Sequence, residues 1–122
     1  MERTQLLFRT APGSQALSGG TTTTLTSDFP NGIAVFHYPI IRILFGNRTS
    51  SGSSVTFNLI MLQGPELIGR LDSVTLSPGE SFTRTYEVPG LALIIDASNN
   101  GTSDSYVDAF LYGFGPNKDW NC

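Results

Sequence analysis

The fold of this chain is decided by residues 73–86, which read SVTLSPGESFTRTY. Short runs of Ser, Thr and apolar residues stand on both sides of the central turn sequence, Ser77-Pro78-Gly79-Glu80. Pro at the second position and Gly at the third are what a type II β-turn requires. The stretch therefore predicts two β-strands that are joined by a tight turn.

Segments of the same kind occupy most of the chain on either side of this turn. They are rich in β-branched and aromatic residues, recur about every eight to twelve residues, and are divided by Gly, Pro and Asn. We expect strands at 21–26, 33–38, 40–45, 54–62, 67–76, 81–86, 91–97 and 106–114. The sequence thus predicts an all-β protein: an antiparallel β-sandwich of about eight strands, of jelly-roll type on strand count, with an extended N-terminal arm.

The N-terminal arm carries three apolar residues, Leu6, Leu7 and Phe8. Because an isolated strand seeks an open sheet edge, these residues are predicted to form an assembly arm that docks on a neighbouring copy. On a regular strand Leu6 and Phe8 share one face and Leu7 takes the other. The alternative is that the arm is an ordinary first strand of the chain's own sheet.

A spacer with Gly and Ser, residues 11–20, separates the arm from the expected domain. Ten residues extend about 33 Å, which is comparable with the width of a domain whose radius of gyration is about 13 Å. We therefore expect three parts: a connector arm and flexible spacer at 1–20, a β-sandwich domain at 21–116 and a polar C-terminal tail at 117–122.

The composition points to assembly. Charged residues make up 14% of the chain, whereas the surface of a soluble monomer usually carries about a quarter or more. The net charge is -3 and the seven basic residues are scattered, which argues against nucleic acid as a partner. A homo-oligomer or helical homopolymer is predicted, with a surface anchor protein as a further partner.

Cysteine content and hydropathy limit the other possibilities. Cys122 is the sole cysteine, so an intrachain disulfide and a cysteine zinc site are excluded, while an intermolecular bond stays open. Glu2, Arg3, Gln5 and Arg9 interrupt the apolar run that a signal peptide needs. No stretch approaches the roughly 20 apolar residues of a membrane helix.

The titratable residues give no catalytic signature. His37 is the only histidine and lies in an apolar segment without a nucleophile-elbow sequence nearby, so it is interpreted as structural. The carboxylates beside turns and in strands could form an acid–base pair only through a tertiary contact; they are Glu66, Glu80, Glu87, Asp72, Asp96, Asp104 and Asp108. The sequence therefore predicts no catalytic residue, no cofactor and no enzyme activity.

Residues 96–104 imitate part of a calcium-binding loop. Oxygen-bearing side chains stand at the first, third, fifth and ninth positions, with Gly at the sixth; they are Asp96, Ser98, Asn100 and Asp104. Position twelve is Val107 rather than Glu, and strands are expected on both sides. A hairpin turn explains the same residues, so this is a weak candidate for a metal site.

Aromatic residues near the C-terminus suggest a second kind of site. Tyr106, Tyr112, Phe114 and Trp120 could form a platform on which sugar rings stack. Aromatic residues in a terminal strand are also typical of a core or of a protein interface. The sequence leaves both interpretations open.

The order of features from residue 55 onward resembles the endospore appendage (Ena) pilin family. The resemblance rests on the stretch SVTLSPGESF at 73–82, on 91–97 and on 106–113. It implies a jelly-roll subunit whose N-terminal connector, here residues 2–15, inserts into neighbouring subunits to build a fibre that is assembled inside the mother cell. The connector cysteines of the better-known members are absent from residues 1–20.

Together these observations predict a structural, self-assembling subunit of an extracellular or spore-surface fibre. Polymerisation is expected to proceed by insertion of the N-terminal strand into neighbouring subunits. The alternative is a non-catalytic surface binding module, either carbohydrate-binding or a trimeric jelly-roll domain.

Overall fold

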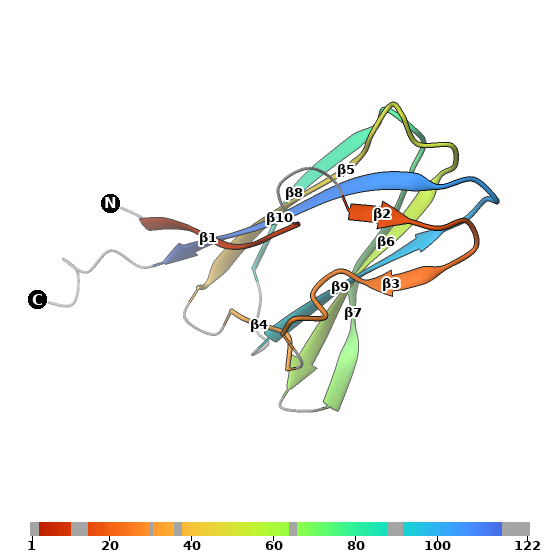
Figure 1. Cartoon of the computed structure of the whole chain (residues 1–122). Helices are drawn as coiled ribbons and strands as arrows, with labels where there is room; N and C mark the ends of the chain where they lie inside the picture. The colour runs from red at the N-terminus through yellow and green to blue at the C-terminus, as the bar shows by residue number, and fades with distance from the viewer. Residues whose placement is uncertain are drawn as a thin grey trace, which may run out of the picture.

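A computed structural model describes residues 3–10, 15–29, 31–35, 38–63, 66–87 and 92–115. Within these residues the chain forms ten β-strands and no helix. The strands make two antiparallel sheets that lie face to face as a sandwich (Figure 1). The predicted all-β sandwich is therefore confirmed, and its architecture is consistent with a jelly-roll type of fold.

The first sheet, called sheet A here, contains the two ends of the described chain. Its order is β1 (Arg3–Arg9), β10 (Ser105–Gly115), β5 (Ile40–Asn47) and β8 (Ser81–Glu87). A short strand, β2 (Gln15–Leu17), pairs with β10 on the same edge as β1. The N-terminal segment thus covers one edge of β10 along most of its length.

The second sheet, sheet B, lies below sheet A in Figure 1. Its order is β3 (Thr22–Thr24), β9 (Ala92–Asn99), β6 (Val55–Gln63) and β7 (Glu66–Leu76), and β4 (Ile33–Ala34) also pairs with β9. The strand β8 forms the edge of sheet A opposite β1, and β7 forms the edge of sheet B opposite β3.

The core lies between the sheets because the strands alternate strictly in burial. Along β10 every second residue from Ser105 to Gly115 is buried. The rings of Phe45 in β5 and Phe57 in β6 stack across the two sheets at a centroid distance of 4.6 Å. Fully buried aliphatic side chains surround this pair, among them Ile41, Ile43, Leu59, Leu93, Ile95 and Leu111.

The predicted turn at 77–80 is confirmed. Glu80 N donates to Ser77 O at 3.0 Å, and Gly79 has a φ of 88°, the left-handed conformation that a type II turn requires. The carboxylate of Glu80 also accepts a hydrogen bond from Ser77 N at 2.6 Å. The turn joins β7 of sheet B to β8 of sheet A, so it carries the chain from one sheet to the other.

The N-terminal part differs from the expected division at residue 20. The expected spacer contains β2, and Leu17 of β2 is only 1% exposed. Both β1 and β2 belong to sheet A, because the edge of β10 offers free backbone groups and the sandwich offers a site for Leu17. Of the strand expected at 33–38, Ile33–Ala34 form β4, and residues 36, 37 and 117–122 lie outside the described residues.

Candidate assembly surface

The strand β1 occupies the edge of β10 in antiparallel register. Arg3 to Leu6 pair with Gly115 to Tyr112, and after a register shift Phe8 and Arg9 pair with Leu111 and Phe110. The shift leaves Leu7 as an extra residue, which is a β-bulge. The single chain therefore adopts the alternative interpretation of the arm, an N-terminal strand on its own sheet.

The bulge corrects the predicted faces of the arm. Leu7 and Phe8 both pack against the core, whereas Leu6 points outward beside Tyr112 and is 44% exposed. On a regular strand the side chains of Leu6 and Phe8 would lie on the same face. The extra residue at the bulge reverses the alternation, so two consecutive residues face inward.

Tyr38 holds the inner side of β1. Its hydroxyl donates to Oε1 of Gln5 at 2.8 Å. Its ring lies over Gly113 of β10, where an added Cβ would come within 2.6 Å of the ring and 3.0 Å of Leu7 Cδ1. Gly113 thus leaves the space in which Tyr38 and Leu7 pack.

The edge of β10 continues from β1 to β2 through Thr10. Thr10 N donates to Ala109 O at 3.0 Å, and Ala109 N donates to Thr10 Oγ1 at 3.4 Å. The strand β2 then pairs with residues 105–107. The two strands differ in burial: β2 contributes a fully buried Leu17, and the apolar side chains of β1 are half-buried or exposed.

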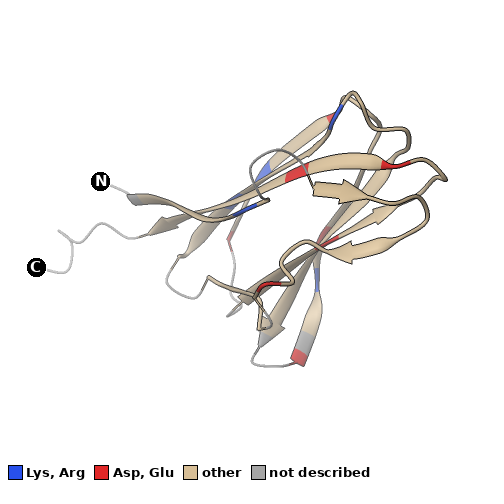
Figure 2. Ribbon diagram, viewed as in Figure 1, with Lys and Arg blue, Asp and Glu red and all other residues tan. Residues whose placement is uncertain are grey.

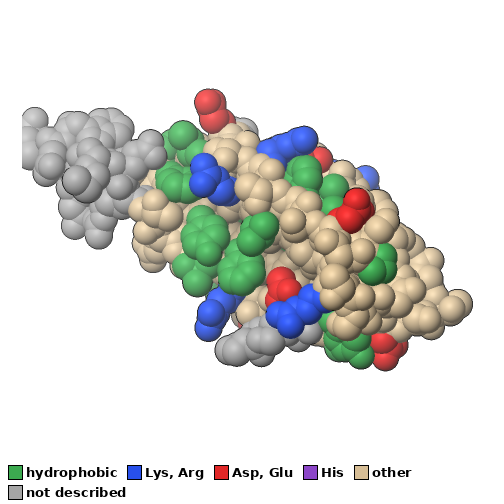
Figure 3. Space-filling view, turned by 90° about the horizontal axis from the view of Figure 1, so that it is seen from above, with side chains coloured by type: hydrophobic (Ala, Val, Ile, Leu, Met, Phe, Trp, Pro, Cys, Tyr) green, Lys and Arg blue, Asp and Glu red, His purple; other side chains and the backbone are tan. Residues whose placement is uncertain are grey.

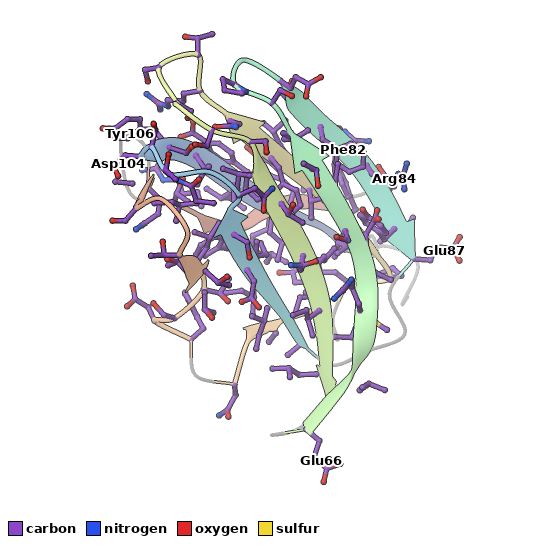
Figure 4. All side chains as sticks on the ribbon, turned by 90° about the vertical axis from the view of Figure 1, so that its right-hand side faces the viewer. Glu66, Phe82, Arg84, Glu87, Asp104 and Tyr106 are labelled. Carbon is purple, nitrogen blue, oxygen red and sulfur yellow. The ribbon has the colours of Figure 1, made fainter. Side chains whose placement is uncertain are left out.

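The opposite edge of the sandwich is closed by side chains. Asp72 of β7 accepts hydrogen bonds from Tyr86 and Arg84 of β8, at 2.5 Å and 3.0 Å. The hydrogen bond from Tyr86 is the main cause that lowers the pKa of Asp72, and burial together with the same bond raises the pKa of Tyr86. Figure 4 shows Arg84 on β8 beside the long edge strand β7.

The outer face of sheet A is apolar at its centre. The outward side chains of β10 are Tyr106, Asp108, Phe110, Tyr112 and Phe114, each half-buried. Leu6 of β1 and Leu44 of β5 stand beside them and are 44% and 36% exposed. We call the set Leu6, Leu44, Phe110, Tyr112 and Phe114 the aromatic face. Figure 3 shows apolar side chains gathered on this side, with basic and acidic side chains around them.

Three of the four residues predicted for a sugar platform lie on this side of the molecule. They are Tyr106, Tyr112 and Phe114; Trp120 lies outside the described residues. Phe110 and Leu44, which the sequence interpretation missed, complete the aromatic face. The alternation of residues 106–114 was the signal that could have found Phe110.

The outer face of sheet B is different. It carries hydroxyl and amide groups that bond to one another across the strands: Thr22 with Ser98 and Thr56 with Thr75, both at 2.8 Å. Asn100 donates to Thr56 Oγ1 at 2.9 Å. Sheet B also exposes one large apolar side chain, Ile68 of β7, at 52%, whereas on sheet A Leu6 and Leu44 are exposed beside the aromatic side chains of β10.

The predicted calcium ligands do not converge on a loop. Asp96 and Ser98 lie in β9, with Ser98 bonded to Thr22. Asp96 and Asn100 are four residues apart along an extended chain, a separation of about 13 Å. Asn100 donates to Thr56 Oγ1, and Asp104 precedes β10 beside Tyr106 (Figure 4). Among the described residues, no group of three His, Cys, Asp or Glu could hold a metal ion.

The other carboxylates lie at separate places (Figure 2). Asp108 accepts two hydrogen bonds from Arg48, at 2.8 and 3.0 Å. Glu66 lies at the tip of β7 and Glu87 at the end of β8 (Figure 4). His37 lies outside the described residues. The described part of the chain contains no helix that is long and apolar enough to cross a membrane.

Comparisons with known proteins agree on the fold. No protein-family model and no curated protein matches the chain. Among solved structures, the PBSX exported protein XepA superposes with a TM-score of 0.65 at 8% identity over 95% of this chain. The chain spans 38% of the length of XepA.

Two further solved structures match nearly their whole length. A subunit of Bacillus endospore appendages, described as disulfide-linked pili, gives a TM-score of 0.51 at 10% identity over 96% of this chain and 92% of its own. The carbohydrate-binding module BiXyn10A CBM1 gives 0.50 at 9% identity over 89% and 98%. At these identities the likeness is one of fold, and it agrees with the fold that the resemblance to the appendage family implied.

Proposed function

We propose that this chain is a non-catalytic structural subunit that assembles with copies of itself by exchange of β1. The observation that carries the proposal is the shallow burial of β1: Leu7 and Phe8 are half-buried and Leu6 is 44% exposed. By contrast, Leu17 of β2 is 1% exposed. The sandwich can therefore keep its main core while β1 leaves, whereas loss of β2 would open the core.

Exchange would place β1 of one chain on the β10 edge of the next. The same residue pairs form in the single chain and in the exchanged assembly. Their contributions to the free-energy difference between the two states therefore nearly cancel. The balance then depends on protein concentration and on the connection between the two strands. That connection, residues 11–14, reads APGS and contains the turn-forming residues Pro12 and Gly13.

The connection also limits the geometry. Because β2 is fixed on its own sheet, only the five steps from Thr10 to Gln15 can extend, which is about 17 Å. This is about half of the reach expected from a spacer of ten residues. An acceptor chain must therefore present its β10 edge close to the β2 strand of the donor.

If each copy donates β1 to the next, the product is an open homopolymer. We place this polymer outside the cell or on a spore surface, and the fold likeness to an endospore appendage subunit and to an exported protein supports that location. Cross-linking by connector cysteines is not part of the proposal, because residues 1–20 contain none. Cohesion would come from strand pairing and apolar burial.

A disulfide between two different chains tests the exchange. Thr4 and Phe114 are direct partners in the β1–β10 ladder, and such cross-strand Cβ atoms lie about 4.5–5.5 Å apart. We would prepare one protein with Thr4→Cys and one with Phe114→Cys, both with Cys122→Ser, then mix and oxidise them. Exchange predicts a cross-linked dimer of the two proteins on non-reducing gels.

The matched control replaces Phe114→Cys by Ser73→Cys, which lies on sheet B and should give no specific product. A chain that carries both Thr4→Cys and Phe114→Cys should close within itself when oxidised as a dilute monomer. If the mixed proteins give no more dimer than the control while this internal disulfide forms, β1 stays on its own sheet and the proposal is wrong.

A further inference from the structure

We propose that the aromatic face is a second contact between copies of this chain, in which two copies pack sheet A against sheet A about a two-fold axis. This inference rests on the proposed function only in that the partner is another copy. It does not depend on the exchange of β1, because the aromatic face is assembled from β1, β10 and β5 in the single chain as well.

The composition of the face is that of a protein contact. Its centre holds Phe110, Tyr112 and Leu44, and Arg42 lies among them with its guanidinium 5.0 Å from the Phe114 ring centroid. Aromatic residues and Arg are enriched at the centres of protein interfaces, and Lys is depleted. The whole chain has a single lysine, Lys118.

The geometry favours a protein over a sugar. Sugar rings stack on free aromatic faces, but one face of Phe114 is covered by Arg42. The rings of Phe110 and Tyr112 lie parallel, with centroids 6.4 Å apart and an interplanar angle of 7°. The most exposed apolar side chains of the face are aliphatic, Leu6 at 44% and Leu44 at 36% exposed. Aliphatic side chains between rings pack well against another packed protein surface.

The charges at the border identify a copy of the same chain as the partner. Arg9 stands at the β1 side in the row of Phe110. Glu87 stands at the β8 side in the row of Ile40 and Phe114. These opposite charges occupy diagonal corners of the face. A two-fold axis along the other diagonal would bring Arg9 of each copy beside Glu87 of the other, so these two corners are complementary. Arg42 lies near that axis, and its guanidinium is turned onto the Phe114 ring.

The size of the face predicts the strength of the contact. Four strands spaced about 4.8 Å apart, over about seven residues of 3.4 Å each, cover about 400 Å². A stable interface buries about 800 Å² per partner. The contact is therefore expected to be weak in isolation, and it becomes effective where exchange of β1 already holds the copies close.

The first experiment measures self-association of the full chain by analytical ultracentrifugation from micromolar to millimolar concentration. Leu44→Glu puts a charge at the centre of the face on an exposed position, so the domain should stay folded while the association constant falls at least tenfold. Ser73→Glu, at an exposed position on sheet B, is the matched control and should change the association constant less than twofold.

The second experiment reverses the charges at the corners. Arg9→Glu and Glu87→Arg should each weaken association several-fold, and the double variant should restore it to within about twofold of the original chain. Neither substitution alters the equilibrium between the single chain and the β1-exchanged assembly, because the β1–β10 pairs are the same in both. Recovery in the double variant identifies the two residues as partners across the contact.

The results separate this inference from the proposed function. Because Phe114 belongs to the aromatic face, the Thr4→Cys and Phe114→Cys cross-link is repeated in chains that also carry Leu44→Glu. Loss of association in Leu44→Glu, with this cross-link between chains retained, supports both. Loss of the cross-link alone refutes exchange and leaves the face contact standing. The inference is overturned if Leu44→Glu associates like Ser73→Glu, or if self-association does not recover in the double charge reversal. It is also overturned if soluble xylan binds the face and Leu44→Glu abolishes that binding without changing self-association.

Discussion

The hydroxyl of Tyr86 in β8 donates a 2.5 Å hydrogen bond to Asp72 in β7, and this bond joins the free edges of the two sheets. Arg84 adds an ion pair to the same carboxylate at 3.0 Å. The edge of the sandwich opposite β1 is thus closed by side chains rather than by a strand. This relationship leads to the first prediction.

Tyr86→Phe should lower the free energy of unfolding by about 1–2 kcal/mol at pH 7, because a hydrogen bond to a partly exposed charge is lost. The pKa of Asp72 is lowered in the folded state, chiefly by Tyr86. The stabilisation is therefore present above the unfolded pKa of about 3.9 and is lost as the pH falls through the lower folded pKa. The variant should accordingly lose less stability on acidification.

Urea unfolding between pH 2 and pH 7 measures this effect. Tyr112→Phe, which removes one hydroxyl from the outer side of β10, is the matched control and should cost less than about 0.5 kcal/mol. An equal acid dependence in Tyr86→Phe and the original chain would show that Asp72 owes its lowered pKa to another group.

The sequence predicted the sandwich because its evidence is local. Residues 73–86 contain both the turn residues and the flanking strand-forming residues, and the structure has a type II turn and strands there. Strands β5, β6, β9 and β10 all overlap the predicted segments, since each is a local run of apolar, β-branched or aromatic residues. The assignment of β7 and β8 to different sheets depends on long-range pairing and could not be read from the turn.

The details of the candidate assembly surface were harder to predict from the sequence. The bulge at Leu7 depends on pairing with β10, which lies a hundred residues further along the chain, so a regular alternation was assumed. Leu17 was hidden in a segment whose Gly and Ser content suggested a spacer. The contact of Tyr38 with Gly113 is tertiary and leaves no pattern in the sequence.

The corrected faces of β1 give the second prediction. Leu7→Ser and Phe8→Ser should each lower the free energy of unfolding by about 1–2 kcal/mol, because both side chains pack against the core. Phe8 also makes an edge-to-face contact with Phe29 at 6.2 Å. Leu6→Ser should cost less than about 0.5 kcal/mol, since Leu6 is 44% exposed.

Hydrogen exchange of the β1 amides, together with thermal unfolding, distinguishes these variants. Faster exchange at residues 4–9 is expected for Leu7→Ser and Phe8→Ser and not for Leu6→Ser. A larger effect of Leu6 than of Leu7 would mean that β1 is a regular strand without the bulge.

Gly113 supports the third prediction. A Cβ at this position would lie 2.6 Å from the Tyr38 ring, so Gly113→Ala should displace Tyr38 or Leu7 and cost about 1–3 kcal/mol. Gly46 in β5 has nothing within 4 Å of an added Cβ. Gly46→Ala should therefore be neutral or stabilise the fold by up to about 1 kcal/mol.

Chemical denaturation of the two alanine variants compares a crowded glycine with an open one in the same sheet. Adding Tyr38→Ala to Gly113→Ala should recover part of the lost stability, because it removes the clashing ring. Equal stabilities of Gly113→Ala and Gly46→Ala would contradict the close packing of Tyr38 on β10.

The last prediction concerns Asn99, which is 3% exposed and ties β2 to the loop between β9 and β10. Its amide donates to Leu17 O at 3.0 Å and to Ser103 O at 2.8 Å, and its Oδ1 accepts from Gly101 N at 3.0 Å. Asn99→Ala should lower the free energy of unfolding by about 2–4 kcal/mol, because it leaves buried backbone groups without partners. Asn58→Ala, at a half-exposed site on the outer face of sheet B, is the control and should cost less than about 1 kcal/mol.

Because Leu17 O belongs to β2, amide exchange at residues 15–17 should also quicken in Asn99→Ala. Unchanged exchange at β2 would show that pairing with β10 alone fixes this strand.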